Sequence, residues 1–377
     1  MPDEHDPEGS TISQTGDKSD ALEAFCALVR KRREEIEALG QLPSDIVLSL
    51  KELGIYRSLV PKTLGGNEIS PSEFLRLIER ISAADGAVGW VSSFAGAVVY
   101  LAGLPQHRFE EFYVGGPDVA FAAGLYPVQP VRRKGDKLIL NGRWKFASGC
   151  TGADWLGVGI TVGEDNRSGK PRVIIFPRER AELIDDWNVV GLAGTGSFDL
   201  VLENVEVEED WSFVRGGKTT RKEPIYGFPI IAFSALNHAI VSIGVAMDAL
   251  AEAKSFCRQN PNTPQLARAT ARLSSARAFV FHQTDRVWEM VRRSMPVPSQ
   301  EQVLLRLAGS FASEAATAAC RTALYSVDQG DAPMAYRNIA RHLRDALVVG
   351  QHAFLSPATY EQAGRFMIDD VVEPGFI

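Results

Sequence analysis

The sequence predicts an α+β fold in which two helical segments flank a central β domain. From about residue 20 to residue 107, apolar residues recur with the spacing of amphipathic helices. Between about residues 117 and 217 the period changes to two, in blocks broken by Gly, Asn and Asp. The helical period returns after residue 224 and continues almost to the C-terminus. Because helices and strands are segregated along the chain, a doubly wound α/β sheet is excluded.

These periods divide the chain into four segments. Residues 1–18 are polar and acidic, and we expect a disordered tail there. We expect an N-terminal helical domain over residues 19–117, the β domain over residues 118–217 and a C-terminal helical bundle over residues 218–377. The apolar stripes behind the helical assignments are Phe74, Leu77, Ile78 and Ile81 in the first domain, and Leu266, Leu273, Val280 and Val287 in the bundle.

Composition narrows the class of protein. The 377 residues include 40 Lys and Arg against 47 Asp and Glu, a formal charge of −7, which argues against a nucleic-acid partner. A hydrophobic content of 45% and a charged content of 23% are typical of a globular protein. The four cysteines lie far apart in the sequence without a CxxC pair, so we expect reduced thiols and a cytoplasmic location. They are Cys26, Cys150, Cys257 and Cys320.

Two long uncharged stretches, Gly86–Gln106 and Pro224–Met247, raise the question of a membrane span. The first is rich in glycine and serine, and the second contains Pro229, Asn237 and His238. Small residues at helical spacing are typical of closely packed helices in a globular bundle. We therefore expect no membrane partner.

A glycine-rich motif, GLAGTG at Gly191–Gly196, invites a dinucleotide-binding interpretation. Its glycines are spaced GxxGxG, and a strand-like FDLVLENV follows where a dinucleotide fold needs a helix, so we predict a tight turn. The chain has no GxxxxGK[ST] motif, no HExxH motif and no spaced His and carboxylate cluster. The sequence therefore predicts neither a recognisable NAD(P)H site nor a metal site.

Three segments, in the correct order, resemble the acyl-CoA dehydrogenase superfamily. They are WKFASGCTGADWLGVGI (144–160), DDWNVVGLAGTGSFDLVLENVEVEEDW (185–211) and RNIARHLRDALVVGQH (337–352). The resemblance implies that superfamily's helix, β and helix architecture from about residue 20 onward. It also implies that the SGCTGADW segment lies along a flavin ring, with Ser148, Gly149 and Trp155 in contact with it. The alternative for this segment is a strand-end turn with a core tryptophan.

The GTGS turn supplies further cofactor candidates. Gly194, Thr195 and Ser197 would offer backbone N–H groups and hydroxyls to flavin or phosphate. A plain tight turn is the alternative for these three residues.

Departures from the dehydrogenases point to a different chemistry. Many dehydrogenases have a catalytic Glu nine residues after the Arg of an Arg-Asp-Ala sequence, but here Arg344 is followed at that distance by Ala353 and one residue earlier by His352. Glu361 lies too far along to replace it. The Thr-Glu-Pro and Gly-Ser-Asp run of the dehydrogenases is also missing from VAFAAGLYPVQP. These features resemble the flavin-dependent monooxygenase branch of the fold, the oxygenase components that act on phenols, secosteroid phenols, indole or dibenzothiophene.

The resemblance implies a mechanism and a set of partners. Reduced FMN or FAD would come from a separate NAD(P)H:flavin reductase, react with O₂ to a C4a-hydroperoxide and transfer oxygen to a small aromatic substrate. The enzyme would be a homotetramer. Ser148 would stand near flavin N5, Trp155 would pack on the ring, and His352 would accept a substrate proton, since a histidine pKa is about 6.5.

The substrate pocket is the least specific prediction. Candidates are Trp90, Phe94, Tyr126 and Phe233, with His238 on the apolar helix 230–250; core packing is the alternative for each. Other functions stay open at this point: an acyl-CoA dehydrogenase with a relocated base, an amino-sugar or amine N-oxygenase, and a non-catalytic flavin-binding relative.

Overall fold

The N-terminal part of the chain is helical. The computed structural model describes residues 9–163, 172–217, 219, 221–257 and 263–370. Its first helices are α1 (Gly9–Leu39), α2 (Ser44–Glu52), α3 (Pro71–Ala84), α4 (Gly86–Ser93), α5 (Val98–Leu101) and α6 (Gln106–Phe112). A capping box of Ser70 and Glu73 starts α3, and the predicted apolar face buries Phe74, Ile78 and Ile81.

The first helix begins earlier than the sequence predicts. Residues 1–8 of the expected tail lie outside the described residues, but residues 9–18 form the first turns of α1. These residues are polar, so the periodicity gives no sign of them. Extending a helix that is already anchored by packing costs far less than starting one, which allows a polar segment to continue the helix outward.

The β domain lies in one sheet. Its strands are β1 (Phe121–Lys134), β2 (Lys137–Ala147), β3 (Trp155–Val162), β4 (Arg172–Pro177), β5 (Glu182–Ile184), β6 (Phe198–Glu208) and β7 (Ser212–Val214). Within the described ranges their order is β5-β6-β2-β1-β3-β4-β7, with β1 and β3 parallel and the other pairs antiparallel. The buried Trp144 of β2 donates from Nε1 to the Gly159 carbonyl of β3 at 2.8 Å, which fixes these strands across β1.

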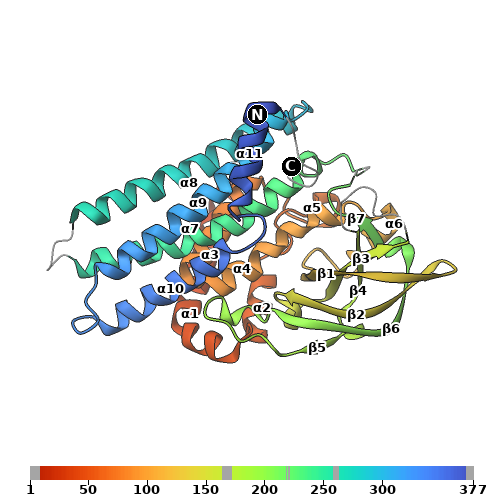
Figure 1. The fold of residues 1–377 in the computed structure, drawn as a ribbon, viewed down its shortest axis with the longest axis horizontal. Helices are drawn as coiled ribbons and strands as arrows, with labels where there is room; N and C mark the ends of the chain where they lie inside the picture. The colour runs from red at the N-terminus through yellow and green to blue at the C-terminus, as the bar shows by residue number, and fades with distance from the viewer. Residues whose placement is uncertain (1–8, 164–171, 218, 220, 258–262, 371–377) are drawn as a thin grey trace, which may run out of the picture.

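The C-terminal helices are α7 (Ile230–Phe256), α8 (Thr263–Arg292), α9 (Ser299–Tyr325), α10 (Pro333–Gly350) and α11 (Ala358–Asp369). Figure 1 shows these long helices on one side of the molecule and the sheet on the other, with α4 between them. Among the described helices, α7 alone has the length and hydropathy of a membrane span, and 89% of its most apolar window is buried within the protein. Its apolar character is therefore explained by its central place in the bundle.

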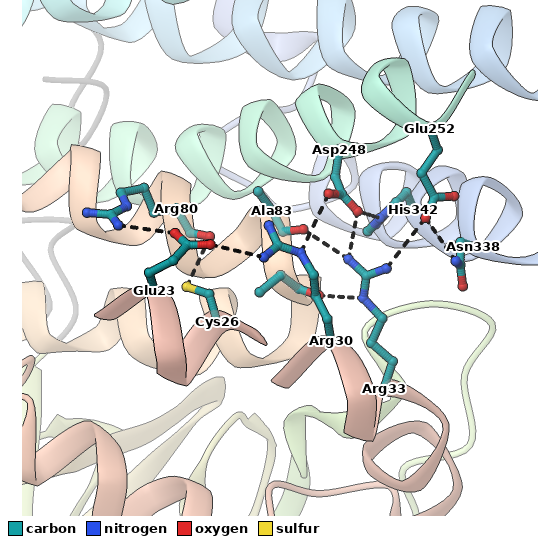
Figure 2. A network of polar contacts seen from close by, with 11 residues as sticks. Glu23, Cys26, Arg30, Arg33, Arg80, Ala83, Asp248, Glu252, Asn338 and His342 are labelled. Atoms are coloured by element: carbon teal, nitrogen blue, oxygen red, sulfur yellow. Dashed lines mark hydrogen bonds and ion pairs between the residues drawn. The ribbon is translucent and has the colours of Figure 1, made fainter. Parts of the chain in front are cut away.

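A buried polar network joins α1, α3, α7 and α10 (Figure 2). Arg33 of α1 donates to the Ala83 carbonyl of α3 at 3.0 Å and to Asp248 of α7 at 2.7 Å. The same carboxylate contacts His342 Nε2 of α10 at 2.9 Å. Burial alone would raise the pKa of Asp248, but hydrogen bonding and positive charge from His342 and Arg33 lower it to about 2. The network thus ties the N-terminal helices to the bundle through one carboxylate that is charged at neutral pH.

Candidate active site

Three aromatic side chains from distant parts of the sequence meet between the bundle and the sheet. Trp90 of α4 stacks on His238 of α7, with ring centroids 4.4 Å apart and planes inclined by 20°. The imidazole of His352, in the turn after α10, lies 4.2 Å from His238 and 5.7 Å from Trp90. Phe94 and Phe354 contact the edges of this group at 5.1 to 6.1 Å. Trp90, Phe94, His238 and His352 are therefore brought together from the predicted set.

Small residues make this convergence possible. A Cβ at Gly96 would lie 2.3 Å from the Asn237 side-chain nitrogen, so glycine lets the segment after α4 approach α7 without displacing this side chain. Asp85 caps α4 by accepting from the N–H groups of Ala87 and Val88 at 2.9 and 3.1 Å. The cap and the close approach together hold Trp90 against His238.

A chain of hydroxyls runs from the GTGS turn to Trp90. The Thr195 hydroxyl donates to the Leu192 carbonyl at 2.8 Å and also lies 2.7 Å from the Ser197 hydroxyl. Ser197 is 2.6 Å from Ser148, and Trp90 Nε1 donates to Ser148 at 3.1 Å. Four residues from three separate segments of the chain are therefore linked by side-chain hydrogen bonds.

The ends of this chain fix its direction. A carbonyl can only accept, so the Thr195 proton is used at Leu192 and Ser197 must donate to Thr195. Ser148 must then donate to Ser197 while it accepts from Trp90. One lone pair of the Ser148 oxygen remains, and the site can offer an acceptor there to a ligand N–H.

The two predicted glycines have structural tasks. A Cβ at Gly194 would lie 2.3 Å from Ile36 Cγ2, so this glycine allows the turn to pack on α1. Gly149, at a φ of 78°, donates its N–H to the Thr195 carbonyl at 2.7 Å. These glycines place the hydroxyl chain, and the tight-turn alternative describes Gly194 better than an anion site does.

Both histidines of the site are neutral. Burial, together with the positive charges of Arg215 and Arg306, lowers the pKa of His352 to about 4. Burial also lowers the pKa of His238 well below its usual range. Nδ1 of His352 accepts from the Phe354 N–H at 3.3 Å, so the proton of the neutral ring is on Nε2. His352 is thus a hydrogen-bond donor in this state, which differs from the general base expected from the sequence.

Two predicted site residues pack against other aromatic rings, and a third is exposed. Trp155 packs on Trp211 and Phe112, at 4.7 and 5.4 Å, and no contact among the described residues joins it to Ser148. Tyr126 of β1 is 64% exposed and pairs with Lys145 of β2, the neighbour of Phe146. Phe233 is buried against Phe74 and Phe228, at 6.2 and 5.5 Å. The core alternative is the better description of Trp155 and Phe233, because residue type alone does not show which side of an element faces the site.

Sequence reasoning missed four residues around the site. Phe146, two positions before Ser148, has a φ of 64° and a side chain that is 55% exposed. The other three are Arg215, Arg306 and Tyr100. The guanidinium groups of Arg215 and Arg306 both lie over the Phe354 ring, and that of Arg215 also lies over Tyr100. The signal for Arg306 was a lone cation in the apolar run VLLRLAG of α9; the positions of Arg215 and Tyr100 depend on long-range packing and leave no local signal.

A cavity of about 140 Å³ adjoins this region. It lies between α5, the segment after β7 and the start of α7, and its wall includes Tyr100, Val214, Gly216, Tyr226 and Phe228. Across the described residues, no group of three or more His, Cys, Asp or Glu is placed to hold a metal ion.

Comparisons with known proteins identify the family. Residues 19–108 match the profile "Acyl-CoA dehydrogenase, N-terminal domain", and residues 236–357 match "Acyl-CoA dehydrogenase, C-terminal domain". An indole-3-acetate monooxygenase from Pseudomonas putida is 39% identical over 376 residues, which cover 95% of each chain. The chain belongs to the flavin-dependent monooxygenases of the acyl-CoA dehydrogenase family.

Further relatives and solved structures are also monooxygenases. The HsaA oxygenase subunit from Rhodococcus jostii is 35% identical over 187 residues, 49% of each chain. The fold matches the crystal structure of 3-HSA hydroxylase from Rhodococcus sp. RHA1 with a TM-score of 0.87 at 24% identity, over 96% of this chain and 98% of that one. It also matches TdsC from Paenibacillus sp. A11-2, solved with FMN and indole, with a TM-score of 0.82 at 19% identity over 96% and 99%. As an oxygenase component, the monooxygenase uses flavin reduced by a separate reductase and acts on a small molecule.

The residues around Ser148 fit a reduced flavin. Reduced flavin carries a hydrogen on N5, and the remaining lone pair of Ser148 is an acceptor of the required kind. The exposed ring of Phe146 lies two residues away on the same segment and offers an apolar face to a planar ligand.

Proposed function

We propose that this chain hydroxylates a small aromatic substrate, with an indole ring as the first candidate. The observation that carries the proposal is the meeting of Trp90, His238 and His352 beside a hydroxyl that is oriented as an acceptor. The names of the relatives from Pseudomonas putida and Acinetobacter baumannii, both indole-3-acetate monooxygenases, support the indole class. Bound reduced flavin, FMN or FAD, would activate O₂ and supply the oxygen atom that the substrate receives.

We assign Ser148 and Phe146 to the flavin. Ser148 would accept from N5–H, while Ser197, Thr195 and Trp90 hold its oxygen in place. Phe146 would pack against the ring, a task that the sequence alone assigned to Trp155. Buried aromatic rings around this point exclude water from the reacting atoms.

The histidines would orient the substrate. His352 would donate from Nε2 to an oxygen of the substrate or of the transferred group, and the flat faces of Trp90 and His238 would bound the ring. The neutral state of both imidazoles keeps the pocket suited to an uncharged aromatic ring.

The assembly and the location are part of the same proposal. All four cysteines are buried and unpaired, which supports a reducing compartment such as the cytoplasm. A homotetramer is supported by apolar side chains exposed on α11, Met367 and Ile368.

The test is a stopped-flow reaction of the protein and reduced FMN, then reduced FAD, with oxygenated buffer. We expect a delay before the absorbance of oxidised flavin appears, longer with the preferred flavin, and an oxygenated product when indole is present. Reoxidation at the rate of free flavin, without product, would overturn the proposal. Reduction of a dye by an acyl-CoA would then favour the dehydrogenase alternative.

A further inference from the structure

Two arginines approach one face of the proposed substrate pocket. The guanidinium carbon of Arg215, just after β7, lies 4.8 Å from the Phe354 ring centroid and 5.5 Å from that of Tyr100. The guanidinium of Arg306 of α9 lies 5.5 Å from the same Phe354 ring. Phe354 in turn contacts His352 at 5.1 Å. The Phe354 ring therefore contacts both guanidinium groups and the imidazole of His352.

We propose that Arg215, supported by Arg306, binds a carboxylate of the substrate and thereby selects aromatic acids over neutral aromatic compounds. This inference rests on the proposed function, because it concerns the same pocket and names a class of substrate for it. It assigns a binding residue that contacts the part of the substrate that does not react.

The hydrogen-bonding state of Arg215 supports this assignment. Its Nε is buried and has no hydrogen-bond acceptor among the residues that the structure describes. Guanidinium Nε and Nη groups form a fork that matches the two oxygens of a carboxylate. A buried donor without an acceptor is costly, so an anionic ligand at this point would remove an existing penalty.

The positive charges of Arg215 and Arg306 also favour an anionic ligand. Arg306 is only 3% exposed and donates from Nη2 to Thr359 at 3.3 Å. Burial, assisted by the charge of Arg215, lowers the pKa of the Arg306 guanidinium to about 10. Two cations that repel each other over one aromatic ring form a site whose electrostatic energy improves when a single negative charge binds between them.

Phe354 contacts both His352 and the proposed acid site. Its ring centroid lies 5.1 Å from that of His352 and 4.8 Å from the guanidinium carbon of Arg215. The charged groups that act on His352 are Arg215 and Arg306, with His238 at its other side. The proposal therefore names an aromatic acid as the substrate class.

The experiment compares an acid with its neutral isostere. Binding of indole-3-acetate and indole-3-acetamide to the flavin-free protein is measured by calorimetry, and both compounds are then used in turnover with reduced flavin. We expect wild type to prefer the acid. Arg215→Gln should raise the Kd of the acid about 10- to 100-fold, the range of a lost charged hydrogen bond, and leave that of the amide unchanged. Arg215→Lys should give an intermediate loss, since it keeps the charge without the fork.

A matched variant and a flavin titration complete the design. Arg76→Gln removes another guanidinium from above an aromatic ring, Phe281, and should change neither Kd. Equal binding of acid and amide by wild type, or equal losses for both in Arg215→Gln, would overturn the carboxylate site. If Arg215→Gln instead weakened FMN but not riboflavin, the anion at Arg215 would be the flavin phosphate, and the proposal would also fail. Absence of turnover with intact selective binding of the acid would count against the proposed function alone.

Discussion

The hydrogen bonds around Ser148 decide whether its hydroxyl donates to a ligand or accepts from it. A serine can donate or accept, but the Leu192 carbonyl at the far end of the chain leaves a single consistent arrangement. That arrangement makes Ser148 an acceptor toward a ligand, and oxidised flavin has no hydrogen on N5 to donate. If Ser148 faces flavin N5 as proposed, the turn would favour reduced flavin through hydrogen bonds that do not contact the cofactor.

Removal of the Thr195 hydroxyl should allow the donor and acceptor order of the hydroxyl chain to reverse. In Thr195→Val the Ser197 proton can turn toward Ser148, which then becomes free to donate to a ligand. We expect the preference for reduced over oxidised flavin to fall about fivefold, the effect of one ordinary hydrogen bond. Anaerobic and aerobic flavin titrations measure it.

A matched control is Thr284→Val, which removes a buried hydroxyl that donates to the Val280 carbonyl within α8 at 2.7 Å. This variant should keep the wild-type preference. A preference that stays unchanged in Thr195→Val would contradict the directed chain.

His352 should titrate far below an ordinary histidine. Its pKa of about 4 in the folded protein lies below the usual value near 6.5, so the unfolded chain takes up the proton first as the pH falls. The contribution of His352 to stability is therefore complete above about pH 6.5 and is lost between there and pH 4. We therefore expect that His352 causes no inflection near pH 6.5 when the turnover rate is measured as a function of pH.

The Arg215→Gln variant tests the cause of this shift. Removal of a neighbouring positive charge should raise the pKa of His352, so the acidic limb of the profile should move to higher pH. His352→Asn, which keeps a donor without a titrating group, should abolish that limb. An acidic limb that persists in His352→Asn would assign it to another group.

At the scale of elements, the Asp248 network holds four helices together. Asp248→Asn should destabilise the protein by about 3 kcal/mol, because Arg33, only 5% exposed, would lose the carboxylate at 2.7 Å and keep only Glu252, at 3.9 Å, as a counter-ion among the described residues. Chemical denaturation measures the change. Since the pKa of Asp248 is lowered to about 2, its contribution in wild type is present above about pH 4 and is lost only as the pH falls toward 2.

The comparison for this prediction is a more exposed ion pair between α2 and α1. Asp45, with its side chain 61% exposed, pairs with Arg32 of α1. Asp45→Asn should change the free energy of unfolding by less than about 1 kcal/mol. Similar losses in the two variants would show that burial does not distinguish the pairs.

For the whole molecule, sequence patterns predicted more of the architecture than of the site. The change of period from helical to two and back reflects which face each element buries, so the order of helices and strands could be read directly. The early start of α1 could not, because the sequence of residues 9–18 is polar and has no apolar period. Fold class follows from local pattern, whereas element ends depend on what lies beside them.

The site shows the same division. Ser148, Thr195, Ser197 and His352 were predicted because they lie in motifs that resemble known ones, and the structure links the first three by hydrogen bonds. Trp155 was selected by residue type, but the start of β3 packs it against Trp211. Arg215 and Arg306 could not be predicted, because they meet at Phe354 only when the end of β7, α9 and the turn after α10 pack together. No local sequence pattern encodes that packing.

One helix spans two regions that have been described separately. α7 carries His238 against Trp90 and, ten residues later, Asp248 in the polar network, about 15 Å along the same axis. An axial displacement of α7 therefore moves the substrate wall and the ion cluster together. We therefore expect Asp248→Asn to lower the yield of oxygenated product per O₂ consumed, with the remainder released as hydrogen peroxide, although the substituted carboxylate contacts neither oxygen nor substrate.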